Sequence, residues 1–245
     1  MRRIYDGKLR KEFGTADDPK SHEWTGRITF LVAVTPAIDR YASVIGVLGE
    51  RFVIVRWPRA SGVEAAVAAM EQDRERAPQE LRSAVHALLN GLPNLQPTLS
   101  LQLKRRIGAL SEIAVRGRAH VVREGYNKDI TYVPEPESNT RLPQQLAQLA
   151  RGSALLDGRS EVSDRDLDLV KRVAFDCMPP VRKAILEHVI AGRSGQPDGI
   201  PGSTVSYGKK DLEAQGLLTD KGALSSLSMD MLAMAGVPIK SEKVA

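Results

Sequence analysis

The stretch Leu103-Lys-Arg-Arg-Ile-Gly-Ala-Leu-Ser-Glu-Ile-Ala114 has the pattern that decides the fold of this chain. Its apolar residues Leu103, Ile107, Leu110 and Ala114 recur at every third or fourth position, which places them on one face of an α-helix. The pattern returns before and after this stretch, with apolar positions at Leu81, Val85, Leu88 and Leu89 and at Leu142, Leu146, Leu149 and Ala150. Residues 62–176 are therefore predicted to form a helical domain.

A further helix of this domain is predicted to begin after Ser163-Asp-Arg-Asp166, which is a variant of the capping box. Its first turn contains Asp164, Asp166 and Asp168, which resemble a set of paired catalytic carboxylates. Acidic residues in the first turn also complement the helix dipole. We therefore interpret them as structural.

Composition narrows the class of protein. The chain has 245 residues, of which 42% are hydrophobic and 4% aromatic, so it can bury cores of Leu, Val, Ile and Ala and is not wholly disordered. Its single cysteine, Cys177, excludes a disulfide framework and a multi-cysteine zinc cluster, and its four histidines have no metal-ligand spacing.

No apolar run is long enough to cross a membrane, and no apolar segment follows the basic start. We expect a cytoplasmic protein without a metal site, whose net charge of +5 permits DNA binding without requiring it.

Residues 1–61 are predicted to form a small α/β portion. Residues 28–34 are a continuous apolar, β-branched run, typical of a strand covered on both faces. A short helix is predicted over 37–48, and a second buried strand over 52–55. This order predicts a parallel-sheet unit, but two strands are too few for an independent domain. The portion is therefore expected to need more sheet than the chain supplies.

Two residues of this portion are candidates for contact with a nucleotide. Thr35 follows the first predicted strand, at the end where α/β sheets bind ligands. Arg51 precedes the second predicted strand, where its guanidinium could reach the phosphates of a neighbouring subunit and stabilise charge in phosphoryl transfer. The alternative is that Thr35 only caps a helix and Arg51 only solvates an edge.

Residues 177–245 have the order of elements found in a winged helix. A helix is predicted around Val181, Ile185 and Val189, then a loop rich in Gly, Ser and Pro, then a second short helix that ends at Gly216. Leu217-Leu218 and Asp220-Lys-Gly222 are predicted to form a small strand and wing turn. In the winged-helix domains that this segment resembles, the second short helix is the recognition helix, and the residues that would face DNA are Ser203, Thr204, Ser206, Tyr207 and Lys210. Winged helices also serve as protein-binding or structural modules, which stays an alternative.

A complete nucleotide site is not predicted for this chain. A phosphate-binding loop ends in Gly-Lys-Ser/Thr, and the nearest segment, Gly202-Ser-Thr-Val-Ser-Tyr-Gly208-Lys-Lys, has one residue too many and lacks the terminal hydroxyl. It also lies in a predicted helix rather than after a strand. We therefore expect the chain alone to bind neither ATP nor Mg²⁺.

Several short motifs resemble the AAA+ ATPases, in particular those of phages and mobile elements, with a lid like that of the MCM helicases. Residues 1–60 resemble the later half of the AAA+ core, in which Thr35 corresponds to sensor 1 and Glu50-Arg51-Phe52 to the arginine finger. Residues 62–175 resemble the helical lid, in which Asn139-Thr-Arg141-Leu corresponds to the start of the sensor 2 helix. Without the resemblance, Arg141 would be expected to pair with Glu135 or Glu137.

The resemblance implies a function and leaves an alternative open. It implies the C-terminal portion of an AAA+-type ATPase that remodels DNA or DNA–protein complexes as a homo-oligomeric ring. ATP and Mg²⁺ would bind only in the intact assembly. This chain is expected to be truncated at its N-terminal side, so that it lacks the phosphate-binding loop and is inactive alone. The alternative is a non-enzymatic winged-helix DNA-binding transcriptional regulator. A third hypothesis is a fragment that misfolds because its sheet is incomplete.

Overall fold

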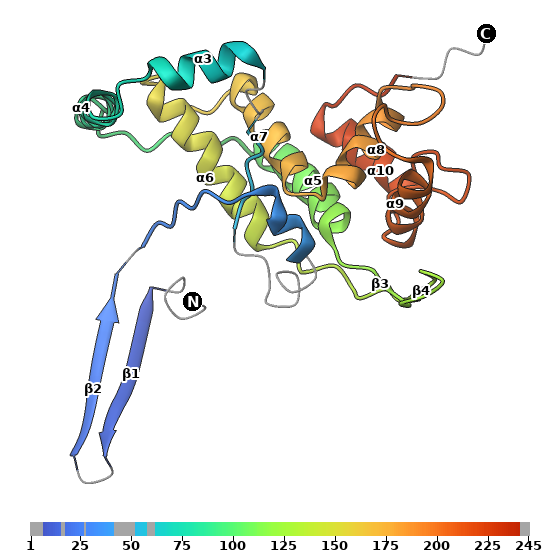
Figure 1. The fold of residues 1–245 in the computed structure, drawn as a ribbon, viewed down its shortest axis with the longest axis horizontal. Helices are drawn as coiled ribbons and strands as arrows, with labels where there is room; N and C mark the ends of the chain where they lie inside the picture. Colours follow the sequence, from blue (N-terminus) through green and yellow to red (C-terminus); the bar gives the residue numbers. More distant parts are fainter. Residues whose placement is uncertain (1–6, 16–17, 27, 42–51, 58–61, 241–245) are drawn as a thin grey trace. The chain divides into compact units, whose positions relative to one another are not determined.

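The computed structural model describes residues 7–15, 18–26, 28–41, 52–57 and 62–240. The chain divides into two compact units, Met1–Arg40 and Tyr41–Ala245, which are described separately below. Helices make up most of the described secondary structure, and the strands form two small antiparallel pairs (Figure 1). The prediction of a mainly helical protein with a small portion that contains strands is confirmed for the described residues. The finer division into an AAA+ core, a lid and a winged helix stays a prediction.

The first unit contains a β-hairpin that the sequence analysis did not predict. Strands β1 (Lys8–Thr15) and β2 (Asp18–Thr25) pair antiparallel, with Lys8 opposite Thr25 and Thr15 opposite Asp18. A short 3₁₀-helix, η1 (Pro36–Tyr41), follows later in the chain. It covers the start of the helix expected over 37–48, whose remaining residues lie outside the described part.

The two strands predicted over 28–34 and 52–55 do not form, so the prediction of a parallel-sheet unit is wrong for the described residues. The first segment exposes its apolar side chains, and Leu31 is 98% exposed. A strand is stable only when a neighbouring strand takes up its backbone N–H and C=O groups. The described residues supply no such neighbour to either segment.

Residues 52–57 instead dock against the helical body of the second unit. Arg56 donates from its backbone nitrogen to Asp176 Oδ2 (3.0 Å) and from Nε to the carbonyl oxygen of Asp176 (2.9 Å). Lys183 Nζ also donates to this buried carboxylate, at 2.6 Å from Oδ1. Val53 packs against the apolar core nearby. Residues 52–57 are thus held by contacts with side chains of the helical body, and not by the pairing with another strand that the sequence predicted for 52–55.

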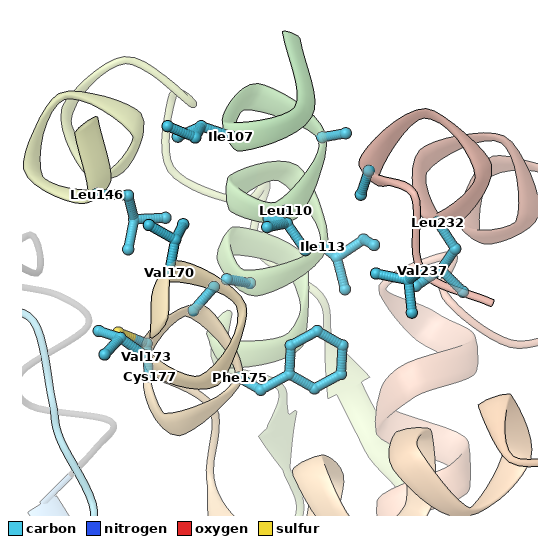
Figure 2. Packing of buried hydrophobic residues seen from close by; sticks show 14 of the residues in the cluster. Ile107, Leu110, Ile113, Leu146, Val170, Val173, Phe175, Cys177, Leu232 and Val237 are labelled. Atoms are coloured by element: carbon cyan, nitrogen blue, oxygen red, sulfur yellow. The ribbon is translucent and has the colours of Figure 1, made fainter. Parts of the chain in front are cut away.

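The centre of the second unit is α5 (Leu101–Arg118), which packs against α6 (Arg141–Leu156), α7 (Asp164–Asp176) and α10 (Ser226–Ala235). Ser100 begins α5, because its side chain accepts the N–H of Leu103 at 3.2 Å. The apolar positions predicted for this helix are buried, namely Leu103, Ile107, Leu110 and Ala114. Figure 2 shows Ile107 and Leu110 lying toward Leu146 and Val170. The helices predicted from this spacing are confirmed here, while a separate domain over residues 62–176 stays a prediction.

Two helices before α5 have no buried residue among those described. They are α3 (Val63–Glu71) and α4 (Arg76–Asn90). The apolar stripe of α4 is present as predicted, but Leu81, Val85, Leu88 and Leu89 are all exposed. The periodicity therefore predicted the helix correctly, while the burial that it implies is absent from the described structure.

The C-terminal helices are α8 (Pro180–Ile190), α9 (Gly202–Ala214) and α10. Helices α8 and α9 pack closely, and a Cβ on Gly208 of α9 would lie 2.5 Å from Ile185 Cδ1. The predicted strand and wing turn are reduced to a single antiparallel bridge between Leu218 and Leu224. Helix α10, which was not predicted, begins at Ser225, whose side chain accepts the N–H of Ser228. The buried residues of α5–α10 form one continuous core.

We predict that Gly208→Leu lowers the free energy of unfolding by about 1–3 kcal/mol, because the added side chain must displace Ile185 from a closely packed interface. The matched control is Gly152→Leu on α6, where a Cβ meets nothing within 4 Å. The control should gain about 0.5–1 kcal/mol from helix propensity. Urea unfolding followed by circular dichroism measures both. Equal stabilisation by the two substitutions would show that α8 and α9 are not held at this distance.

Candidate nucleic-acid interface

The residues predicted to contact a nucleotide do not form a described site. Thr35 is exposed and precedes η1, where its carbonyl oxygen accepts the N–H of Ile38 at 3.1 Å. Arg51 lies outside the described residues. Arg141 is half-buried and is the first residue of α6. Thr35 and Arg141 belong to different units, so their roles as sensors stay predictions.

One of the two acids expected near Arg141 takes part in another interaction. Glu137 forms an ion pair with Arg118, whose side chain is almost fully buried.

Within the described residues, His, Cys, Asp and Glu side chains form no cluster of three that could hold a metal ion. None of the described helices is both long and apolar enough to span a membrane.

The residues predicted to face DNA lie on α9. Ser203, Ser206, Tyr207 and Lys210 are exposed on one side of the helix, because they are three, four and seven positions apart. The opposite side buries Val205, Gly208 and Leu212. Thr204 is half-buried between the two sides. The exposed side therefore gathers four of the five predicted residues, and their contact with DNA stays a prediction.

A network of charged side chains fixes α9 to the rest of the unit. It includes β3 (Val122–Arg123), which pairs antiparallel with β4 (Ile130–Tyr132). Arg123 donates from Nε and Nη2 to Asp211 Oδ1 (3.1 and 2.5 Å), and Arg182 donates from Nε and Nη2 to Asp211 Oδ2 (3.2 and 2.9 Å). An unpaired carboxylate at Asp211 would repel DNA phosphates. Two arginines offset its charge in the folded protein.

The same network reaches α5 and His120. Arg182 is buried and donates from Nη1 to the carbonyl oxygens of Gly117 (3.2 Å) and Ala119 (2.6 Å) at the end of α5. Burial, followed by the positive charge of Arg182, lowers the pKa of His120 below its ordinary value. The imidazole of His120 is therefore neutral at pH 7 and adds no charge to this region.

The β1–β2 hairpin has two faces of different chemistry. Because paired residues of an antiparallel ladder lie on the same face, the pairs Leu9–Trp24, Lys11–His22 and Phe13–Lys20 share one side. The rings of Phe13 and His22 stack there, with centroids 5.0 Å apart and planes at 17°. Over residues 8–13 and 20–25 this face has three aromatic rings and two lysines, and it has no carboxylate.

Over the same residues, 8–13 and 20–25, the carboxylates lie on the opposite face, where they are paired. Arg10 lies between Glu12 and Glu23, with Nη2–Oε1 and Nη1–Oε1 distances of 3.1 and 3.4 Å. The first face was not predicted from the sequence. A signal that could have found it is the even spacing of Leu9 with Phe13 and of His22 with Trp24, because a period of two places such residues on one face of a strand.

The first-turn acids of α7 are structural, as interpreted from the sequence. The buried carboxylate of Asp166 accepts from Arg159 Nη1 (2.8 Å) and Nη2 (2.6 Å) and from the backbone nitrogen of Ser163 (2.8 Å), which completes a capping box. Hydrogen bonds from Arg159 hold the pKa of Asp166 far below its ordinary value. Asp164 pairs with Arg106 of α5.

With this geometry in place, we compared the chain with protein-family models, curated proteins and solved structures, and none of the three comparisons gave a match.

We predict that Asp166→Asn lowers the free energy of unfolding at pH 7 by about 3 kcal/mol, because Arg159 and the capping box lose a buried anionic acceptor. The lowered folded-state pKa means that this stabilisation is present above the unfolded pKa of about 4 and is lost as the pH falls toward the folded value. The variant should therefore show a flatter decline of stability below pH 4. Asp168→Asn, an exposed position on the same helix, is the control. Urea unfolding at pH 7 and pH 3 measures the difference, and an equal response of the two variants would contradict the assignment.

Proposed function

We propose that this chain binds DNA, and that the face of the β1–β2 hairpin formed by Leu9, Lys11, Phe13, Lys20, His22 and Trp24 is its contact surface for single strands. Lysines on such a face neutralise phosphates, and aromatic rings stack on unpaired bases. The separation of charge over residues 8–13 and 20–25 supports the proposal, because the carboxylates of Glu12 and Glu23 lie on the other face beside Arg10. Asp18, at the end of the hairpin, pairs with Thr15 in the register of the proposed face.

The exposure of the hairpin gives further support. A two-stranded hairpin is marginally stable in water unless its side chains pack against another layer. Lys11, Phe13, Lys20 and His22 are exposed within their unit. Phe13 contacts the ring of His22 without being buried, and it remains 42% exposed.

The exposed side of α9 is proposed as a second contact, for duplex DNA. The hydroxyl groups of Ser203, Ser206 and Tyr207 can donate to phosphates or base edges, and Lys210 adds a cation. A protein with separate contacts for single strands and for duplex suits the remodelling of DNA that the sequence predicted. A winged-helix regulator would use the duplex contact alone and would select particular sequences.

We predict that Lys11→Gln combined with Lys20→Gln weakens single-stranded DNA binding by about tenfold at 50 mM salt, because two phosphate contacts are lost. The slope of log K against log salt should fall by about 1.4, at about 0.7 for each contact. Fluorescence anisotropy with labelled oligonucleotides measures both quantities on the full chain. Lys8→Gln, which removes one charge on the other face of the same strand, is the matched control for Lys11→Gln alone. An equal loss in Lys8→Gln and Lys11→Gln, or no binding by the unaltered chain, would overturn the proposal.

We also propose the function that the resemblance implied, in which residues 62–176, with α3–α7, serve as the lid of an AAA+-type ring. The position of Arg141 supports this proposal. It is the first residue of the 16-residue helix α6, at the end of the macrodipole that favours anions. In the intact assembly Arg141 and Thr35 would contact the nucleotide of their own subunit, and Arg51 that of a neighbour, with Mg²⁺ at the phosphates.

We expect the purified chain to hydrolyse no ATP above the level of a mock purification, because it lacks a phosphate-binding loop. A coupled phosphate-release assay, with and without single-stranded DNA, measures this. The test for the lid is to mix the chain with an AAA+ core fragment that binds ATP and to compare Arg141→Ala with Arg151→Ala, ten residues further along α6. Hydrolysis by the chain alone at a rate that follows its concentration would contradict the proposal.

A further inference from the structure

We propose that the β3–β4 hairpin acts as the wing beside α9, and that its tip, Tyr126 and Lys128, contacts the duplex DNA that α9 binds. This inference rests on the proposed contact of α9 with DNA. In a winged helix the wing usually follows the recognition helix, but here the turn after α9 is closed by the single bridge between Leu218 and Leu224. The β3–β4 hairpin lies between α5 and α6 in the chain, about 80 residues earlier.

The hairpin is attached directly to the proposed recognition helix. Arg123 of β3 donates from Nη2 to the carbonyl oxygen of Tyr207 (3.1 Å) and from Nε and Nη2 to Asp211 Oδ1. Its guanidinium carbon lies 5.1 Å from the centroid of the Tyr207 ring. Because Arg182 holds the other oxygen of Asp211 from α8, the hairpin, α8 and α9 are fixed through one carboxylate. A ligand on the exposed side of α9 would therefore meet the hairpin at a defined position.

The tip of the hairpin is shaped so that an aromatic ring projects into solvent. The carboxylate of Glu124 accepts the backbone N–H groups of Tyr126 (3.0 Å) and Asn127 (2.6 Å), which fixes the turn. The side chain of Tyr126 is 90% exposed. Such exposure is unfavourable for an aromatic side chain in water, and it is expected where the ring contacts a ligand.

Lys128 has a backbone conformation that glycine would adopt more easily. Its φ is 60°, and no other non-glycine residue in the described ranges has a positive φ. The left-handed region costs a residue with a Cβ roughly 1–2 kcal/mol. A residue with a side chain in this strained conformation is a reason to look for a function. The ammonium group of Lys128 donates to the carbonyl oxygen of Gly125 (2.7 Å) and places a positive charge at the tip.

The hairpin and α9 contain equal numbers of cations and carboxylates, so local arrangement rather than net charge would bring an anion to the tip. Over residues 122–132 and 202–214 the cations are Arg123, Lys128, Lys209 and Lys210, and the carboxylates are those of Glu124, Asp129, Asp211 and Glu213. Of the nearby acids, Asp211 is held by two arginines, and the carboxylate of Glu124 already accepts two backbone N–H groups. Asp129 and Glu213 are exposed and would have to lie away from the phosphates.

The test uses the full chain, a labelled DNA duplex and fluorescence anisotropy across a salt series. We expect Tyr126→Ala combined with Lys128→Gln to weaken duplex binding by about five- to thirtyfold and to lower the salt slope by about 0.9, since one phosphate contact and one aromatic contact are lost. The control is Lys104→Gln on α5, an exposed cation of the same type away from this hairpin. Both tip residues are exposed, so the melting temperature should be unchanged, which separates lost contact from lost folding.

The outcomes distinguish this inference from the proposed function. If Lys210→Gln weakens duplex binding and the tip variant does not, the hairpin is no wing and the contact of α9 stands. If the unaltered chain binds no duplex, the contact of α9 and the wing both fail, while single-strand binding by β1–β2 is judged separately. If the tip variant and the Lys104→Gln control weaken binding equally, the effect is one of net charge and the inference is overturned.

Discussion

The burial of α5 on more than one side is the constraint on which the described helical structure depends. A helix with a single apolar stripe can pack against one layer, but α5 also buries Ala109 and Ile113, which lie outside the stripe predicted from the sequence. Ile113 lies toward Leu232 of α10 and Val237 (Figure 2). Arg106 reinforces this packing, because its Nε donates to the carbonyl oxygen of Ala235 at 3.0 Å. Helices α6 and α7 are therefore joined to the C-terminal helices through α5, in one core.

Charged groups in this unit serve mainly to fix elements in place. Asp166 holds the start of α7 through Arg159 and Ser163, Asp176 holds residues 52–57, and Asp211 holds α9 and the β3–β4 hairpin. A buried carboxylate is costly unless its oxygens are paired, and removal of one partner leaves an uncompensated charge. These groups are consequently poor candidates for catalysis. The cations that we propose to contact DNA are exposed ones, such as Lys11, Lys20 and Lys210.

Apolar side chains without a partner are the second general feature of the described residues. The segment 28–34 and the stripe of α4 have patterns typical of buried elements, yet they are exposed. A pattern in the sequence reports which side chains favour burial, and it does not specify the surface that covers them. This is why the spacing of Leu81, Val85 and Leu88 predicted a helix correctly, while the apolar run from Ile28 to Val34 wrongly predicted a strand.

The sequence by itself determined the helices from α4 to α9 but not α10, because apolar spacing such as that of Leu103, Ile107 and Leu110 and caps such as Ser163 are local features of the chain. It also placed Ser203, Ser206, Tyr207 and Lys210 on one side of a helix, because the helical period fixes which residues share a face. Only the tertiary structure decided that Gly208 permits the close approach of α8 and α9, that Asp211 is neutralised, and that Arg123 brings a distant hairpin to α9. These features depend on residues about 20 to 90 positions apart in the chain, and the sequence pattern carries no information about such pairs.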